Sequence, residues 1–74
     1  MQKNPLLMFG ARLVQLRKEK GWSQEKLSLE SGLARSYLGG VERGQRNIAL
    51  LNICRLAETF GISPAELFKY DTKK

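Results

Sequence analysis

Three glycines divide this sequence into short segments, and each segment has the apolar periodicity of a helix. Gly21, Gly32 and Gly61 each follow an amphipathic stretch, and glycine readily adopts the left-handed backbone conformation with which many helices end. Within the segments, apolar residues recur at spacings of three and four, which places them on one face of a helix. The sequence therefore predicts an all-α fold built from short helices.

The first predicted helix begins at Asn4 and Pro5. Proline is favoured at the first helical position because its missing N–H group would have no partner there. Lys18, Lys20 and Gly21 close the helix with favourable charge and a glycine stop. The apolar stripe of this helix is predicted to consist of Leu6, Phe9, Leu13 and Leu16.

A second helix is predicted over residues 24–31. Ser23 can cap its start, and Gly32 ends it. Trp22 before the cap and Leu27 inside the helix have the spacing of a hydrophobic staple.

The strongest helix-start signal in the sequence is ISPAEL, in which Ser63 would cap a last short helix beginning at Pro64. Glu66 would complete the capping box, and Ile62 could staple against Leu67. The preceding helix, which Gly61 stops, is predicted to place six residues on one wide apolar face and to leave Leu51 off it. These six are Leu50, Ile53, Cys54, Leu56, Ala57 and Phe60.

Length and composition bound the classes of protein to which the chain can belong. Its 74 residues predict one domain over 1–74, with an ordered core of about 5–69 and short tails, and a chain this short buries only about 60% of its unfolded surface. One cysteine, Cys54, and no histidine argue against a disulfide framework, a metal site or another cofactor; the thiol is expected to act as a small core hydrophobe. The formal charge of +6 favours a polyanionic partner, either nucleic acid or an anionic membrane surface. No apolar run is long enough for a membrane span or a secretory signal, so the protein is expected to be intracellular.

The stretch ARSYLGGVERGQRN contains two adjacent glycines inside a helical pattern, although each costs about 0.8–1.0 kcal/mol relative to alanine. At 100° per residue, Leu38 and Val41 fall on one half of this helix. The opposite half has little bulk, and such a face could approach DNA closely in the major groove. The simpler interpretation is that the glycine pair marks a turn and the helix ends at Leu38. The low-bulk half consists of Arg35, Ser36, Gly39, Gly40 and Arg43.

The spacing of residues upstream of the glycine pair favours a continuous helix over a turn at that pair. Six residues match, in register, the pattern of two short helices joined at a glycine turn: Gln24, Leu27, Gly32, Leu33, Leu38 and Val41. With RLVQLRKEKGWSQEKLS and RSYLGGVERGQRN, the chain resembles the phage repressor and Cro type of helix-turn-helix domain. Within that type it is most similar to the controller proteins of bacterial restriction-modification systems. The resemblance covers about residues 6–69.

The resemblance implies a compact five-helix bundle whose second and third helices form the helix-turn-helix. It also implies a homodimer that binds a palindromic operator in double-stranded DNA and regulates its own gene and a neighbouring endonuclease gene, with RNA polymerase as a further candidate partner. Arg35, Ser36 and Arg46 would lie near base edges, and Gln24 would clamp a phosphate. Three more residues would lie near the DNA backbone or the centre of the site: Tyr37, Arg43 and Asn47. Tyr37 lies at the edge between the two faces of its helix, so it could pack in the core, bind phosphate, or do both.

The same resemblance implies that Arg17 and Glu42 form a buried or half-buried ion pair between the first helix and the end of the recognition helix. The alternative is that both are solvated surface charges. The sequence departs from the family at Ala34 and Ala49, where a capping side chain is usual, and each loss should cost about 1 kcal/mol. Ser28 stands where the family often has alanine, and it needs a backbone partner if buried.

Four apolar residues exceed what one small core needs and are predicted to form a self-complementary dimer patch, unless they are scattered surface residues: Leu51, Leu67, Phe68 and Tyr70. The function predicted is that of a sequence-specific, DNA-binding transcriptional regulator in the bacterial cytoplasm, associated with the nucleoid. Alternatives are a prophage repressor or an antitoxin of the same fold, or a protein-interaction module that does not bind DNA. An enzyme is disfavoured because no nucleophile, base or phosphate-loop constellation is present.

Overall fold

The computed structural model describes residues 4–70, and within them the chain is all-α. It contains α1 (Pro5–Glu19), α2 (Gln24–Ser31), α3 (Arg35–Glu42), α4 (Leu50–Phe60) and a 3₁₀ helix, η1 (Pro64–Phe68). The predicted fold class is therefore confirmed, but the fifth element is a single 3₁₀ turn and not an α-helix. The predicted tails lie mostly outside the described residues, at 1–3 and 71–74.

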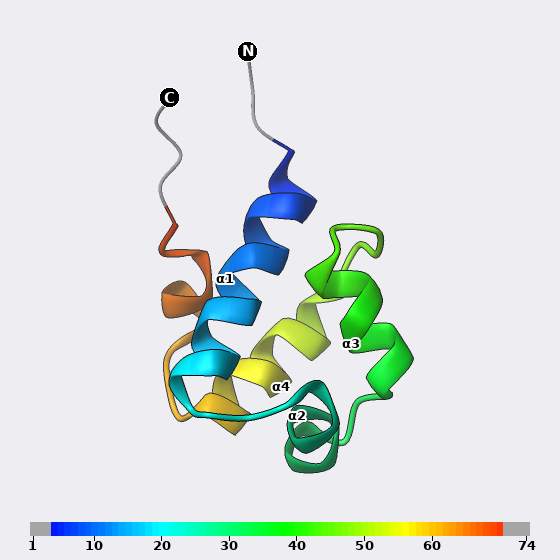
Figure 1. Cartoon of the computed structure of the whole chain (residues 1–74). Coiled ribbons are helices and arrows are strands. Elements are labelled where there is room, and N and C mark those ends of the chain that lie inside the picture. The colour runs from blue at the N-terminus through cyan, green and yellow to red at the C-terminus, as the bar shows by residue number, and fades with distance from the viewer. Residues whose placement is uncertain (1–3, 71–74) are drawn as a thin grey trace.

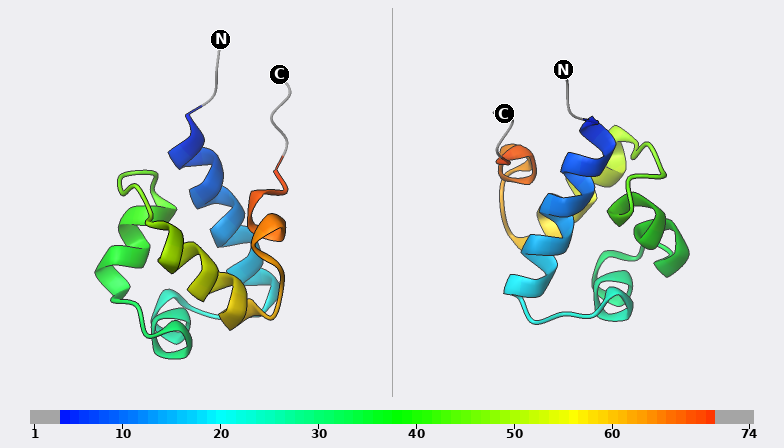
Figure 2. Two further views of the ribbon diagram at one scale, coloured as in Figure 1. Left: turned by 180° about the vertical axis from the view of Figure 1, so that it is seen from behind. Right: turned by 45° about the horizontal axis from the view of Figure 1, so that its top comes forward.

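The helices enclose one small core (Figures 1 and 2). Helix α3 packs against α1 and α2, α2 also touches α4, and η1 packs against α1 and α4 on the other side of the molecule. The core consists of Phe9, Leu13, Leu16, Leu27, Leu38, Val41, Leu56, Ala57, Phe60 and Leu67. None of the described helices is both long enough and apolar enough to cross a membrane.

Most of the predicted helix ends are confirmed. The Asn4 side chain accepts a hydrogen bond from the backbone N–H of Leu6 at 2.8 Å, and the Ser23 hydroxyl accepts one from Lys26 at 3.0 Å. Gly32 and Gly61 have φ of 79° and 73° and end α2 and α4 in the left-handed conformation. The expected lack of side-chain caps before α3 and α4 is also confirmed.

The predicted capping box at Ser63 is wrong. The Ser63 side chain makes no cap hydrogen bond, because the Glu66 N–H that would donate to it donates instead to the Ser63 carbonyl at 3.0 Å. The Glu66 carboxylate, which the reciprocal half of the box requires, faces other partners. It lies 3.7 Å from Arg12 and 3.4 Å from Lys69. Arg12 also donates from Nε to the Glu66 carbonyl oxygen at 2.9 Å, so η1 is tied to α1 rather than capped.

Burial corrects three residues of the apolar pattern. Leu50 is 72% exposed and Cys54 is also exposed, because only the second half of α4 is covered by neighbouring elements. Leu67 is fully buried. It therefore belongs to the core and not to a dimer patch.

The turn between α2 and α3 is held by two serines. Ser28 donates from its hydroxyl to the Leu33 carbonyl at 2.6 Å. This bond is the backbone partner that Ser28 was predicted to need. The buried Ser31 hydroxyl accepts a hydrogen bond from the Leu33 N–H at 3.1 Å. Trp22, which precedes the cap residue of α2, stacks its ring on Phe60 with centroids 5.8 Å apart.

Helices α1 and α3 touch backbone to backbone at Gly10, a residue whose role the sequence interpretation missed. A Cβ at Gly10 would lie 2.5 Å from the carbonyl oxygens of Val41 and Glu42. Because these acceptors belong to the backbone, they cannot move aside without shifting a helix. Gly10 therefore fixes how closely the end of α3 approaches α1.

Candidate nucleic-acid interface

Helix α3 continues through both of its glycines. It runs from Arg35 to Glu42, and neither Gly39 nor Gly40 is among the glycines with positive φ. The predicted helix is confirmed at this point, and the interpretation that the pair marks a turn is wrong.

The face beside the glycines is nevertheless not empty, which corrects the prediction that this face has little bulk. Both glycines are buried by long polar side chains of this chain. A Cβ at Gly39 would lie 3.1 Å from Arg43 Nη1 and 3.6 Å from Gln24 Oε1, and a Cβ at Gly40 would lie 2.6 Å from Arg46 Cγ. In this structure the space beside the two glycines is therefore occupied by side chains from the segments that flank the helix.

The segment after α3 turns back toward the helix through a Schellman motif. Gly44 has φ 74°, its N–H donates to the Val41 carbonyl at 3.0 Å, and the Gln45 N–H donates to the Gly40 carbonyl at 2.8 Å. This pair of hydrogen bonds satisfies the free carbonyls at the helix end and directs Arg46 back along α3.

Tyr37 links this segment to α4. The Arg46 guanidinium carbon lies 5.8 Å from the centroid of the Tyr37 ring, within the range of a cation–π contact. The ring packs against the core, and the Tyr37 hydroxyl accepts a hydrogen bond from Asn52 Nδ2 at 3.1 Å. Tyr37 therefore packs in the core, as one of its predicted roles required, and also supports an arginine.

The predicted pair of Arg17 and Glu42 is confirmed, and the structure adds a third partner. Glu42 accepts from Arg17 Nε at 2.7 Å and Nη2 at 3.0 Å, and from Gln24 Nε2 at 2.7 Å. The side chains of Arg17 and Glu42 are 12% and 4% exposed. This network joins α1, the start of α2 and the end of α3, so it sets the position of α3 relative to the rest of the fold. The Gln24 amide nitrogen has a second hydrogen beyond the one that it donates to Glu42.

The side chains proposed to touch DNA are mostly exposed around α3. Arg35 and Ser36 lie in its first turn, and Arg43, Arg46 and Asn47 follow its end; all five are exposed. The acidic side chain nearest in sequence, Glu42, is already paired with Arg17. The exposed surface of this helix and its flanking turn is therefore positively charged.

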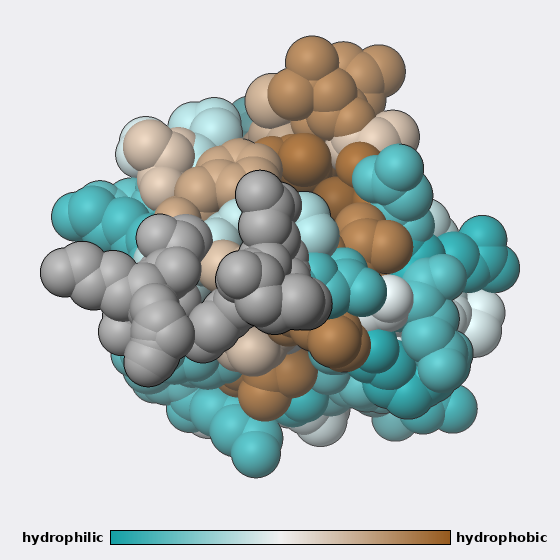
Figure 3. Space-filling view, turned by 90° about the horizontal axis from the view of Figure 1, so that it is seen from above, coloured by the Kyte–Doolittle hydropathy of each residue, from teal (hydrophilic) through white to brown (hydrophobic). Residues whose placement is uncertain are grey.

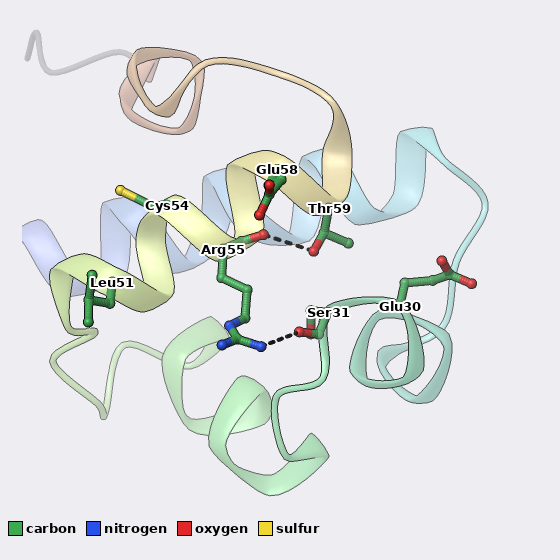
Figure 4. Close-up of a pocket in the computed structure, with 7 residues that line it drawn as sticks. All are labelled: Glu30, Ser31, Leu51, Cys54, Arg55, Glu58 and Thr59. Carbon is green, nitrogen blue, oxygen red and sulfur yellow. Dashed lines mark hydrogen bonds between the residues drawn. The ribbon is translucent and has the colours of Figure 1, made fainter.

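The predicted dimer residues fall on two separate elements. Leu51 is 80% exposed on the first turn of α4, beside a groove that α4 forms with the end of α2 (Figure 4). Phe68 is 46% exposed, and its ring lies 5.4 Å from that of Phe9 and 6.4 Å from that of the half-buried Tyr70. At the end of the molecule where α1 begins, apolar patches alternate with hydrophilic ones (Figure 3).

Comparison with known proteins assigns the chain to a family. The helix-turn-helix family profile matches residues 13–67, so the chain belongs to the helix-turn-helix family of transcriptional regulators. It is a DNA-binding transcriptional regulator and not an enzyme.

The relatives include restriction-modification controller proteins. The crystal structure of the controller protein C.AhdI from Aeromonas hydrophila is 60% identical, with a TM-score of 0.83, and the match covers 85% of this chain and 96% of that one. The control protein C.BamHI of Bacillus amyloliquefaciens is 40% identical over 97% of this chain and 90% of its own length. The structure of the biofilm regulator SinR in complex with DNA is 33% identical, with a TM-score of 0.79, over 84% of this chain and all of that one (100%).

Proposed function

We propose that this protein is the controller of a restriction-modification system, which binds a palindromic operator as a homodimer and regulates transcription of its own gene and of an endonuclease gene. Two controller proteins similar to it over most of their length support the assignment. The observation that carries it is the exposed arginine surface formed by α3 and the turn that follows it. The helix is fixed in place by the buried pair of Arg17 and Glu42.

Base recognition is assigned to Arg35, Ser36 and Arg46. Arg35 and Ser36 occupy the first turn of α3, the part of a recognition helix that reaches base edges in the major groove. A guanidinium can donate two hydrogen bonds to one guanine, so each arginine could discriminate strongly among base pairs.

Phosphate contacts are assigned to residues that flank α3. Gln24 begins α2 next to Gly39, and Arg43 and Asn47 lie in the exposed segment beyond the helix. The Tyr37 hydroxyl also has a lone pair or proton left beyond its bond to Asn52. Such contacts set the register of the protein on the duplex without selecting its sequence.

Dimerisation is assigned to the exposed apolar residues Leu51 and Phe68, with Tyr70 beside Phe68. An isologous interface places each of these residues against the same surface of a second copy. Two copies related by a two-fold axis would present two α3 helices to two half-sites, which is why a palindrome is expected.

Selection of bound sites from random duplexes tests the proposal. We expect one palindromic sequence, bound by two protein chains per duplex in sedimentation, and an affinity that falls with salt. A single asymmetric half-site bound by a monomer would contradict the homodimer, and the absence of any selected sequence would favour a protein-interaction module. Location of the selected palindrome upstream of an endonuclease gene would separate a controller from a prophage repressor or an antitoxin.

The proposed function also sets where the protein acts and a further partner. An operator on the chromosome would place the protein in the bacterial cytoplasm, at the nucleoid. An activator bound beside a promoter would lie next to RNA polymerase, so we include the polymerase as a partner to be tested with the selected duplex.

A further inference from the structure

We infer that Gly40 and Tyr37 are positioning residues for Arg46, which they hold against α3 before DNA binds. On this proposal Gly40 serves recognition through the arginine that it accommodates, and not by leaving space for DNA. The inference rests on the proposed role of Arg46 in operator recognition.

The first step is the space that Gly40 provides. Arg46 Cγ lies 2.6 Å from the place where a Cβ at Gly40 would stand, and Arg46 Nε and Cβ lie 3.6 and 3.7 Å from it. Any residue other than glycine at position 40 would displace the Arg46 stem, because real Cβ atoms do not approach another carbon atom as closely as 2.6 Å. The neighbouring Gly39 differs, since its Cβ would meet the flexible end of Arg43 at 3.1 Å.

The second step is the support for the guanidinium. The Tyr37 ring lies 5.8 Å from the Arg46 guanidinium carbon and is itself fixed twice, by the core and by the hydrogen bond from Asn52. The Schellman motif at Gly44 fixes the backbone that leads to Arg46. The stem, the charged group and the backbone of Arg46 are therefore each held by a different contact.

The consequence for recognition is entropic. A free arginine side chain loses considerable rotamer freedom when it docks on a base. An arginine already held beside the recognition helix loses less, so the same base contact contributes more to affinity. The contact selects sequence, so a displaced Arg46 should weaken binding to the operator more than binding to other DNA.

A double-mutant cycle with Gly40→Ala and Arg46→Ala tests the inference. The probes are a palindromic duplex selected by the unaltered protein and a scrambled duplex of the same composition. We expect Gly40→Ala to lower the ratio of the two affinities by a large part of the loss caused by Arg46→Ala, which is about 5-fold to 150-fold for one bidentate base contact. In the Arg46→Ala background, Gly40→Ala should have no further effect. An equal loss in both backgrounds would overturn the inference, because it would mean that the added methyl group meets DNA directly.

A second measurement needs no DNA and so separates this inference from the proposed function. In the free protein, the Arg46 side-chain NMR signals should carry a ring-current shift from Tyr37. Gly40→Ala should abolish the shift and Gly39→Ala should retain it. Persistence of the shift in Gly40→Ala would overturn the inference, even if the unaltered protein binds its operator. If the shift is lost in Gly40→Ala but the unaltered protein binds no operator, the proposed function alone is refuted.

Circular dichroism melting completes the test. Gly40→Ala should fold, because alanine is the better helix former and Arg46 is exposed and can swing away. If Gly40→Ala fails to fold but the double variant folds, Arg46 is the obstructing group and the inference stands. If both fail to fold, another group occupies the space and the inference falls.

Discussion

Removal of the Glu42 carboxylate should destabilise this domain more than any change to an exposed charge. Glu42 accepts three hydrogen bonds, two from Arg17 and one from Gln24, and its side chain is 4% exposed. Glu42→Ala leaves the Arg17 guanidinium with the Trp22 carbonyl as its remaining partner in the described part of the chain. Removal of one partner from a buried ion pair costs about 3–5 kcal/mol. This is a large share of the free energy of unfolding, which is expected to be about 4–11 kcal/mol for a chain of this length.

Urea unfolding followed by circular dichroism measures this loss, at one protein concentration because a dimer would add to the apparent stability. The matched control is Glu30→Ala, which removes the exposed pair of Lys26 and Glu30 at 3.0 Å and should cost about 0.3–0.5 kcal/mol. A Glu42→Ala loss as small as that of the control would refute the argument. The double variant Arg17→Met with Glu42→Met should recover much of the loss, because no unpaired charge is then left buried.

Four other substitutions test separate parts of the structure. Arg35→Ala should reduce discrimination between the selected and scrambled duplexes by about 1–3 kcal/mol in competition binding, and equal weakening on both duplexes would assign Arg35 to phosphate. Arg43→Ala should weaken all duplexes alike and flatten the salt dependence by about one unit of slope; an unchanged slope would show that Arg43 neutralises no phosphate. Leu51→Asp changes an exposed side chain and should give a folded monomer in sedimentation, whereas a persistent dimer would place the interface elsewhere. Gly10→Ala should lower the free energy of unfolding by about 1–3 kcal/mol through overpacking, and an unchanged urea midpoint would show that α1 and α3 can separate freely.

Local signals in the sequence determined most of the helix boundaries. Asn4, Ser23, Gly32 and Gly61 act at the positions predicted for them, because a cap or a left-handed glycine depends on hydrogen bonds within a few residues. The helical wheel also assigned Leu38 and Val41 of α3 to the core correctly.

Contacts between distant segments decided the remainder. Cys54 shares the apolar face of α4 yet is exposed, because a wheel shows which residues lie on one face and not how far neighbouring helices cover it. Glu66 turned to Arg12 and left Ser63 without its capping box. The Arg46 side chain occupies the space beside Gly40, because the turn after α3 reverses the chain. Each outcome depends on which groups the folded chain brings into competition for the same partner or space, and sequence spacing alone does not contain that information.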